Sequence, residues 1–127
     1  MIQGRVSELT AEIAISFTLP EGRRAAIAFV IDTGFLGGIA LPEETLVALG
    51  FPLFGKTNAI LADGTIRATP VYDTRIVWGE STKRVAALAM GDRPLLGTAL
   101  LEECRLEVEF TEGGAVRISP LGNRGTE

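Results

Sequence analysis

The sequence predicts a mainly β protein with two short helices. Apolar and polar residues alternate with a period of two through much of the chain, which is typical of strands with one buried face. Residues that favour tight turns separate these segments, and only two segments have helical spacing. The expected turns lie at Gly22, Asp63-Gly64, Gly79-Glu80, Gly91-Asp92 and Gly113-Gly114.

The strands follow in order along the chain. Residues 12–19 place Ile13, Ile15 and Phe17 on one side of an extended segment. Residues 23–31 begin with two arginines and become wholly apolar, which predicts a strand buried on both faces. Further strands are expected at residues 83–90, 105–110 and 115–119.

The longest expected strand covers residues 66–78. Pro70 lies within it and favours an edge position or a bend, because proline cannot donate a backbone hydrogen bond. One face carries Ile66, Ala68, Tyr72, Ile76 and Trp78, and the other carries Arg67, Thr69, Asp73 and Arg75. We expect Tyr72 and Trp78 to pack in the core rather than to form a stacking surface for bases.

Two short helices interrupt the strands. The first is expected from Pro42, with two glutamates in its first turn and Gly50 as its stop. Its buried side chains are expected to be Leu46, Val47 and Leu49. The second is expected over residues 97–104, with Leu100, Leu101 and Cys104 at helical spacing. This position predicts a buried and inert thiol for Cys104.

Length and composition favour one globular domain. The chain has 127 residues, of which 46% are hydrophobic and 22% are charged, so it can bury a core and is not expected to be disordered. We expect a single domain over residues 1–119. We expect a flexible C-terminal tail over residues 120–127.

The net charge of the chain and the length of its apolar runs indicate which partners and which cellular compartment to expect. The net charge is −4, and the twelve Lys and Arg residues form no basic cluster, so nucleic acid is not expected as a partner. The longest apolar run, residues 25–31, is too short to span a membrane, so no membrane association is expected. A single cysteine and an N-terminus without a continuous apolar core favour a cytoplasmic protein.

Histidine is absent from the sequence, which narrows the chemistry. The absence excludes Ser-His-Asp and Cys-His catalysis and the usual zinc sites of enzymes. Residues 34–38 lack the Lys-Ser/Thr pair of a phosphate-binding loop. The densest acidic group is interpreted as solvated surface rather than a cation site, and consists of Glu102, Glu103, Glu107 and Glu109. We therefore expect no metal and no cofactor.

The most informative stretch is AFVIDTGFLGG, residues 28–38. Asp32 ends an apolar strand, Thr33 offers a compact hydroxyl, and Gly34 permits a sharp reversal of the chain. One interpretation is a turn in which the Asp32 carboxylate accepts hydrogen bonds from its own backbone. The other is half of an active site, in which Asp32 is a catalytic carboxylate.

Two features downstream complete an ordered set of motifs. LADGT, residues 61–65, contains the Asp-Gly pair of a hairpin, and PLLG, residues 94–97, precedes the second helix. This order resembles the retropepsin-like (clan AA) aspartic proteases. IDTGFLGGIALPEETLVALGF, LADGT and PLLGTALLEECRLEVEF are similar in particular to the single-lobed bacterial and archaeal predicted aspartyl proteases whose motif reads DTGF. The resemblance extends from about Gly4 to Ile118.

The resemblance implies a retropepsin-like single-lobe closed β-barrel with two short helices, active as a homodimer. Asp32 would be the catalytic aspartate, Thr33 would form hydrogen bonds across the subunits, and Gly34 would complete the loop. The residues expected to pack beneath this loop are Leu95, Leu96 and Gly97. The residues expected in a flap that closes over a bound peptide are Ala62, Asp63, Gly64 and Thr65.

Hydrolysis in this class uses two carboxylates that share one proton, and the chain contains only one Asp-Thr-Gly. The near-match Asp73-Thr74-Arg75 lacks the glycine and lies within an expected strand. The second aspartate is therefore expected from a second copy of the chain, across a two-fold axis. The leading hypothesis is a homodimeric aspartic endopeptidase acting on a peptide or protein substrate.

Two other hypotheses remain open. The expected flap, LADGTIR, is polar, and a fold does not determine a function. The alternative is therefore a catalytically silent dimeric binding or regulatory module with the same fold. The third hypothesis is an enzyme that cleaves only itself or one partner.

Overall fold

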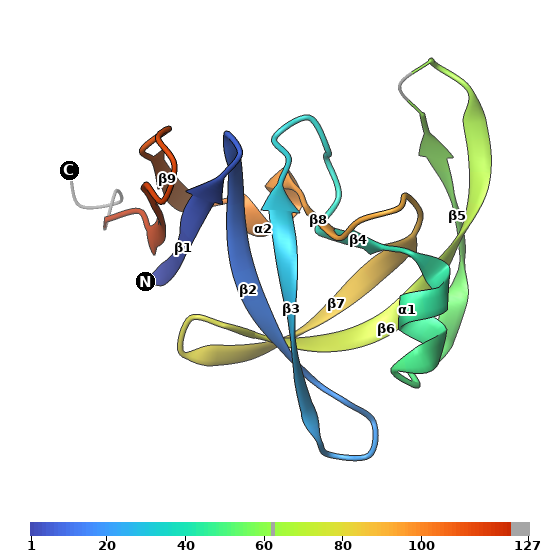
Figure 1. Cartoon of the computed structure of the whole chain (residues 1–127). Helices are drawn as coiled ribbons and strands as arrows, with labels where there is room; N and C mark the ends of the chain where they lie inside the picture. The colour runs from blue at the N-terminus through green and yellow to red at the C-terminus, as the bar shows by residue number, and fades with distance from the viewer. Residues whose placement is uncertain (62, 123–127) are drawn as a thin grey trace.

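A ten-stranded sheet and two short helices account for most of the chain (Figure 1). This architecture comes from a computed structural model, which describes residues 1–61 and 63–122. The strands are β1 (Ile2–Ser7), β2 (Thr10–Thr18), β3 (Arg24–Ile31), β4 (Ile39–Leu41), β5 (Leu53–Ile60), β6 (Ile66–Trp78), β7 (Ser81–Ala89), β8 (Leu95–Leu96), β9 (Cys104–Val108) and β10 (Ala115–Pro120). The helices are α1 (Glu43–Ala48) and α2 (Thr98–Leu101). The expected class, mainly β with two short helices, is confirmed.

The strand order places β8 in the middle of the sheet. The order is β5-β6-β7-β4-β8-β3-β2-β1-β10-β9, so β8 lies between β3 and β4 although it is far from both in sequence. It runs parallel to β3 and antiparallel to β4. The sheet also folds back on itself, because β2 pairs with β6 through Phe17 and Ile76. The two ends of the sheet are β5 and β9.

The core lies inside the curve of the sheet. Phe17 and Phe29 are fully buried, and their ring centroids lie 5.8 Å apart. Phe51, which follows α1, packs against the Phe17 ring with the centroids 5.6 Å apart. Ile13, Ile15 and Phe17 are all buried, as the alternation in residues 12–19 predicts. Fully burying an aromatic or branched side chain of this kind contributes about 1.5–3 kcal/mol.

The expectation that β3 is buried on both faces is wrong. Phe29 is fully buried, but Ala26 and Ala28 on the opposite face are exposed. Alanine is small enough to stand in solvent at little cost, so an apolar run that contains it does not require a second packed layer. The strand therefore has one core face and one face covered by small side chains.

Of the three side chains that we expect to be buried at α1, one points toward solvent instead of toward the core. Leu46 is fully buried and Leu49 is partly buried, whereas Val47 is 59% exposed. Successive residues of a helix point about 100° apart, so the neighbour of a buried Leu46 turns toward solvent. Helix α1 thus attaches to the core mainly through Leu46.

Strand β6 has the bounds that the sequence predicts, but its two faces differ from the expectation. Ile66 is 68% exposed and Ala68 is also exposed, while Thr69 is 2% exposed and buried with Val71. From Ile66 to Tyr72 the strand pairs with β5, and the outer part of this hairpin projects from the body of the molecule (Figure 1). Alternation alone cannot distinguish a projecting segment from one that lies over a core.

The C-terminal part also differs from the expectation. Helix α2 ends at Leu101, so Cys104 is not helical but opens β9, and its side chain is partly buried. Glu103 has a φ of 63°, a left-handed conformation that ends the helix and starts the strand. Of the tail expected at residues 120–127, residues 123–127 lie outside the described residues. No helix among the described residues is long and apolar enough to cross a membrane.

Candidate active site

Asp32 lies directly after β3, in a turn that its own carboxylate stabilises. The backbone N–H of Gly34 donates to Asp32 Oδ1 at 2.9 Å. The N–H of Phe35 donates to the Asp32 carbonyl oxygen at 3.1 Å, and the N–H of Asp32 donates to the Leu96 carbonyl oxygen at 2.9 Å. Asp32 itself is partly buried. The turn interpretation of Asp32 is therefore correct for the backbone. Only Oδ1 of the carboxylate accepts a hydrogen bond, and Oδ2 has no partner among the described residues.

The segment that carries Leu95, Leu96 and Gly97 lies directly beside this turn. Leu95 and Leu96 pair with Val30 and Ile31 at the end of β3. Three backbone N–H groups then donate to the loop that follows Asp32: Gly97 to Gly38 at 2.8 Å, Thr98 to Phe35 at 2.9 Å and Ala99 to Gly37 at 3.1 Å. The three support residues expected from the sequence are therefore brought together with Asp32.

Gly97 is a position where a side chain cannot fit. A Cβ atom there would overlap the carbonyl oxygen of Gly37 and would lie 2.5 Å from that of Phe35. It would also lie 2.6 Å from Cδ2 of the Phe35 ring. Because two of these neighbours are backbone atoms, they cannot rotate away. The glycine thus permits the close approach that lets α2 begin against the Asp32 loop.

Sequence reasoning missed three residues of this arrangement: Phe35, Gly37 and Gly38. Their carbonyl oxygens accept the bonds from Gly97, Thr98 and Ala99. A Cβ atom on Gly37 would lie 2.6 Å from Cζ of Phe35, so the ring covers this glycine closely. The sequence does contain a signal for this contact. Gly37 and Gly38 are adjacent and follow Phe35 by two residues, a pattern that allows the backbone and the ring to approach each other closely.

The expected flap is the hairpin of β5 and β6 (Figure 1). Within its turn, Asp63 Oδ1 accepts hydrogen bonds from the N–H of Thr65 at 3.0 Å and from its hydroxyl at 2.7 Å. The hydroxyl bond is the largest of the interactions that lower the pKa of Asp63 below its ordinary value. Gly64 has a φ of +86°, a conformation that glycine adopts without strain. Ala62, the fourth expected flap residue, lies outside the described residues.

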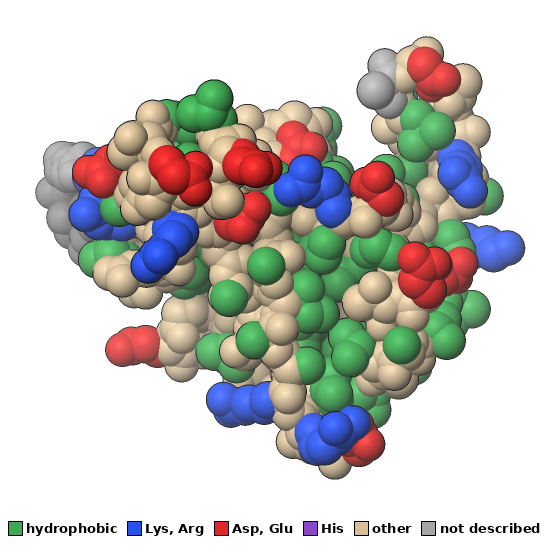
Figure 2. Space-filling model, viewed as in Figure 1, with side chains coloured by type: hydrophobic (Ala, Val, Ile, Leu, Met, Phe, Trp, Pro, Cys, Tyr) green, Lys and Arg blue, Asp and Glu red, His purple; other side chains and the backbone are tan. Residues whose placement is uncertain are grey.

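Hydrophobic side chains on the flap are exposed. Ile60 is 75% exposed and Ile66 is 68% exposed, and the two are opposite each other in the hairpin. Figure 2 shows the hairpin as an arm that stands away from the rest of the surface, with hydrophobic and charged side chains along it. The flap therefore has apolar groups that one chain leaves in solvent.

The base of the flap is tied to α1. The Tyr72 hydroxyl donates to Glu43 Oε2 at 2.8 Å, and this bond raises the pKa of Tyr72. A cavity of about 410 Å³ lies beside this contact. It is lined by residues of α1, of the flap and of the end of β7, namely Glu43, Leu61, Arg67–Pro70 and Ala89–Gly91. Asp32 does not line this cavity.

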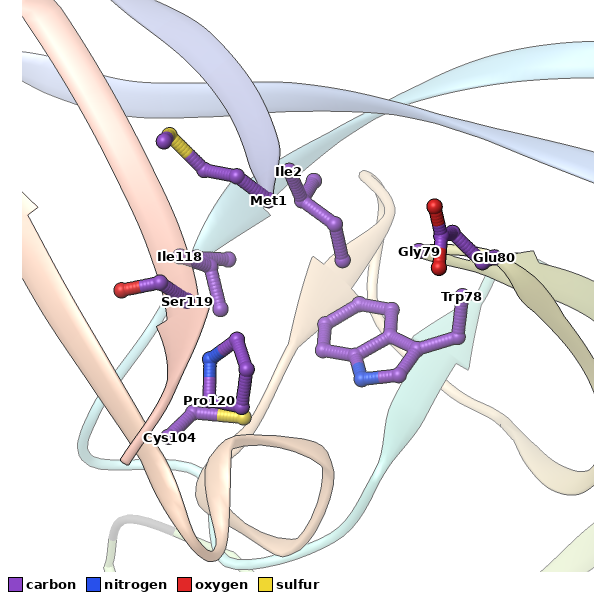
Figure 3. Close-up of a pocket in the computed structure, with 9 residues that line it drawn as sticks. All are labelled: Met1, Ile2, Trp78, Gly79, Glu80, Cys104, Ile118, Ser119 and Pro120. Atoms are coloured by element: carbon purple, nitrogen blue, oxygen red, sulfur yellow. The ribbon is translucent and has the colours of Figure 1, made fainter. Parts of the chain in front are cut away.

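A second cavity, of about 340 Å³, lies between the N-terminus and the end of β10, and no residue of the Asp32 loop lines it. The Trp78 indole points into it, and the Cys104 sulfur lies at its edge (Figure 3). Trp78 is therefore partly open to solvent, whereas Tyr72 is buried as expected. Among residues 1–61 and 63–122, no group of three or more His, Cys, Asp or Glu side chains could hold a metal ion.

The fold and the Asp32 loop together define a class of structure. A β-sheet curves back on itself, and a Leu-Leu-Gly segment and the start of a short helix hold an Asp-Thr-Gly turn in place. Among solved structures, the chain is similar to a retropepsin-like aspartic protease from Rickettsia conorii, with a TM-score of 0.57 and 21% sequence identity. The match covers 91% of this chain and 88% of that one. The fold is retropepsin-like, as the sequence predicts.

The comparisons of sequence alone give no match. No protein-family model matches the chain, and no curated protein matches it. At 21% identity the structural similarity concerns the fold, so the narrower resemblance to the DTGF group stays a prediction.

Proposed function

We propose that the protein is a homodimeric aspartic endopeptidase in which each copy contributes Asp32. One observation carries the proposal. Within a retropepsin-like fold, Asp32 directly follows strand β3, and the Gly34 N–H orients its carboxylate. A carboxylate that is positioned by backbone groups, rather than paired with a cation, is available for proton transfer.

The chemistry requires two such carboxylates. When two Asp32 side chains meet across a two-fold axis, their repulsion keeps one proton between them. The ionised carboxylate takes a proton from a water molecule, whose oxygen attacks the scissile carbonyl carbon. The protonated carboxylate donates its proton to the carbonyl oxygen. The bond from Gly34 to Oδ1 leaves the second oxygen of Asp32 available for these transfers.

Several features support a second copy as the source of the other carboxylate. Asp63 is bonded to Thr65 and Asp73 is bonded to Arg84, so these aspartates are engaged elsewhere. Next to Asp32, the Thr33 side chain is exposed, and Leu36 is 79% exposed. The surface beside Asp32 is therefore accessible to a partner copy. We propose that Thr33 forms hydrogen bonds to the partner copy there.

The substrate class follows from the flap and the sheet. We propose that an extended peptide binds between the flap and the Asp32 loop, bonded through its main chain like an added strand. The exposed Ile60 and Ile66 would contact its apolar side chains. Main-chain bonding favours extended or unfolded segments over folded domains, whose backbone groups are already paired.

The test is cleavage of an unbiased peptide library by the wild type and by Asp32→Asn, between about pH 3 and pH 8. Asparagine can still accept the bond from the Gly34 N–H, so the loop is retained while proton transfer is lost. We expect the cleavage rate of Asp32→Asn to be about 10²–10⁴-fold lower than that of the wild type. The matched control is Asp92→Asn, an exposed aspartate in another turn, which should keep full activity.

Activity that survives Asp32→Asn would reject Asp32 as the catalytic group. A protein that is strictly monomeric at the assay concentration would reject the shared site. A dimer that cleaves no peptide at any pH in this range would favour the catalytically silent binding or regulatory module.

A further inference from the structure

The outward face of β6 and β7 carries two arginines that lie directly opposite each other. Thr74 and Ile76 face the core, so the side chains of Asp73 and Arg75 point to the other side of β6. In the antiparallel register Arg75 is paired with Arg84 of β7. Like charges in such a pair destabilise a sheet, so this arrangement is unfavourable for the fold alone.

Asp73 offsets the repulsion between the two arginines only in part. Arg84 Nε donates to Asp73 Oδ1 at 2.7 Å, and this bond is the main cause that lowers the pKa of Asp73, with a smaller contribution from the charge of Arg75. Within the described residues Arg75 forms no ion pair, and the terminal nitrogens of Arg84 donate no hydrogen bond. One carboxylate thus stands beside two guanidinium groups, which keep a net positive charge and free donors.

A β-bulge brings an aromatic ring to the same place. Leu53 and Gly55 of β5 are opposite two adjacent residues of β6, so Phe54 is the extra residue of the bulge. Bulges redirect side chains and are frequent beside functional sites. The Phe54 ring is 67% exposed, and its centroid lies 5.8 Å from Cζ of Arg84. Opposed like charges and an exposed aromatic ring therefore meet in one place, which is typical of a functional surface.

Two cavities flank the arginines, and Asp73 lines both. The first, of about 330 Å³, is lined by Arg75 and by a mostly apolar wall from the β2–β3 turn and the segment before β5. The apolar side chains of this wall are Leu19, Pro20, Phe51 and Pro52. The second cavity, of about 210 Å³, is lined by Phe54, Arg84 and Ala86. No described residue of 32–38 or 61–65 lines either cavity, so this surface is separate from the candidate active site.

We propose that this surface binds an extended segment of another protein in which one Asp or Glu side chain lies between two apolar side chains. The carboxylate accepts hydrogen bonds from Arg75 and Arg84, because guanidinium groups match the geometry of a carboxylate. In an extended segment, side chains two positions apart lie about 7 Å apart on one face. The apolar residues two positions before and after the carboxylate therefore reach the two cavities.

Other anions fit this surface less well. An inorganic phosphate satisfies the arginines but leaves Phe54 and the apolar walls uncovered. A nucleic acid carries many phosphates, whereas this surface has two cations on a chain whose net charge is −4. The inference takes nothing from the proposed function, because binding here does not involve Asp32.

The test is binding to an array of heptapeptides whose central residue is Glu, Gln or Lys and whose other positions are varied small and apolar residues. The full chain carries Asp32→Asn, so that cleavage cannot remove the peptide. We expect Glu peptides to bind about tenfold more tightly than their Gln counterparts, because hydrogen bonds to a charged group are lost in Gln. This preference should weaken as the ionic strength rises.

The key variant is Arg75→Gln, because Arg75 has no ion pair to lose. We expect Glu peptides to bind about tenfold more weakly to it, while the midpoint of thermal unfolding stays the same or rises, because the repulsion from Arg84 is removed. The matched control is Lys83→Gln, which removes one positive charge from the neighbouring position of β7, paired with Ile76 on the other face. It should keep the preference for Glu.

A second variant tests the apolar part of the surface. Phe54→Ala should weaken the binding of Glu peptides that carry an aromatic residue two positions from the Glu. Because Phe54 is mostly exposed, the midpoint of thermal unfolding should change little. Equal binding of the aromatic peptides to this variant and to the parent chain would remove Phe54 from the surface and overturn the proposed contact on that side.

The other results decide the inference as a whole. Equal binding of Glu and Gln peptides, or a Glu preference that persists in Arg75→Gln, overturns it. A large fall in the thermal stability of Arg75→Gln overturns it as well, since Arg75 would then serve the fold. Inorganic phosphate or a single-stranded RNA that binds more tightly than the best Glu peptide identifies a different ligand. All of these outcomes leave the proposed function intact, and a Glu preference that depends on Arg75 supports the inference even when the wild type cleaves no peptide.

Discussion

The Asp32 loop and the flap are both turns at the ends of strands, yet they are held in opposite ways. The loop after Asp32 accepts backbone bonds from Gly97, Thr98 and Ala99, and the bond between the Thr98 hydroxyl and Phe35 spans 63 residues of sequence. The flap turn is held by bonds between residues two to four positions apart, such as those of Asp63 with Thr65. The loop that carries Asp32 is therefore fixed by a distant segment, and the flap turn by its own residues.

This difference indicates which part can move. A segment with mostly local bonds and few buried side chains opens at low free-energy cost, whereas a loop packed against backbone does not. Surface lids that admit and release a substrate are drawn from segments of the first kind. The two regions should therefore respond very differently to a single added methyl group.

The largest effect is expected for Gly97→Ala. The new Cβ would collide with the carbonyl oxygens of Gly37 and Phe35, so the segment from Leu95 to Ala99 must shift. We expect the free energy of unfolding to fall by about 3 kcal/mol or more, as for other severe backbone and packing changes. Denaturant unfolding followed by circular dichroism measures this.

The matched control is Gly55→Ala in β5, where an added Cβ meets no atom within 4 Å. Its free energy of unfolding should stay within about 0.5 kcal/mol of the wild type. If Gly97→Ala were as stable as this control, the close packing beneath the Asp32 loop would not constrain that loop.

An intermediate and local effect is expected for Gly64→Ala. Nothing lies near the new Cβ, but the residue has a φ of +86°, so the turn is strained by about 1–2 kcal/mol. Because the turn is held locally, we expect faster hydrogen exchange at the Leu61 and Thr65 amides without a comparable loss in global unfolding. A full-sized fall in global stability would mean that the flap is coupled to the core.

The smallest effect is a pH dependence of the flap turn. The Thr65 hydroxyl lowers the pKa of Asp63 below its ordinary 3.8, so this bond stabilises the turn above pH 3.8 and is lost as the pH falls through the lowered value. The Thr65 amide signal in NMR should therefore titrate below pH 3.8. In Asp63→Asn it should not titrate, and a midpoint above 3.8 would contradict the bond.

Local features of the fold could be predicted from the sequence. The bounds of β6 and the turn at Asp63-Gly64 depend on residues close together in the chain, and both are correct. The position of Asp32 after an apolar strand is of the same kind. Turn chemistry and alternation act over a few residues, so a single sequence contains them fully.

Features that depend on distant segments could not be predicted in the same way. The contacts of Phe35 and Gly37 exist because β8 inserts between β3 and β4, which no local pattern encodes. The exposure of Ile66 and the burial of Thr69 depend on where the hairpin leaves the body of the molecule. Cys104 was expected in a helix because apolar spacing did not reveal the turn at Glu103.

The insertion of β8 has a consequence for how the protein is made. During synthesis the chain emerges from its N-terminus, so Asp32 and its turn leave the ribosome long before Leu95 to Ala99 exist. Contacts between segments so far apart in sequence form late and slowly in folding. The Asp32 loop therefore has its final backbone bonds only after most of the chain has been translated, and a nascent fragment that ends before β8 carries the aspartate without its support.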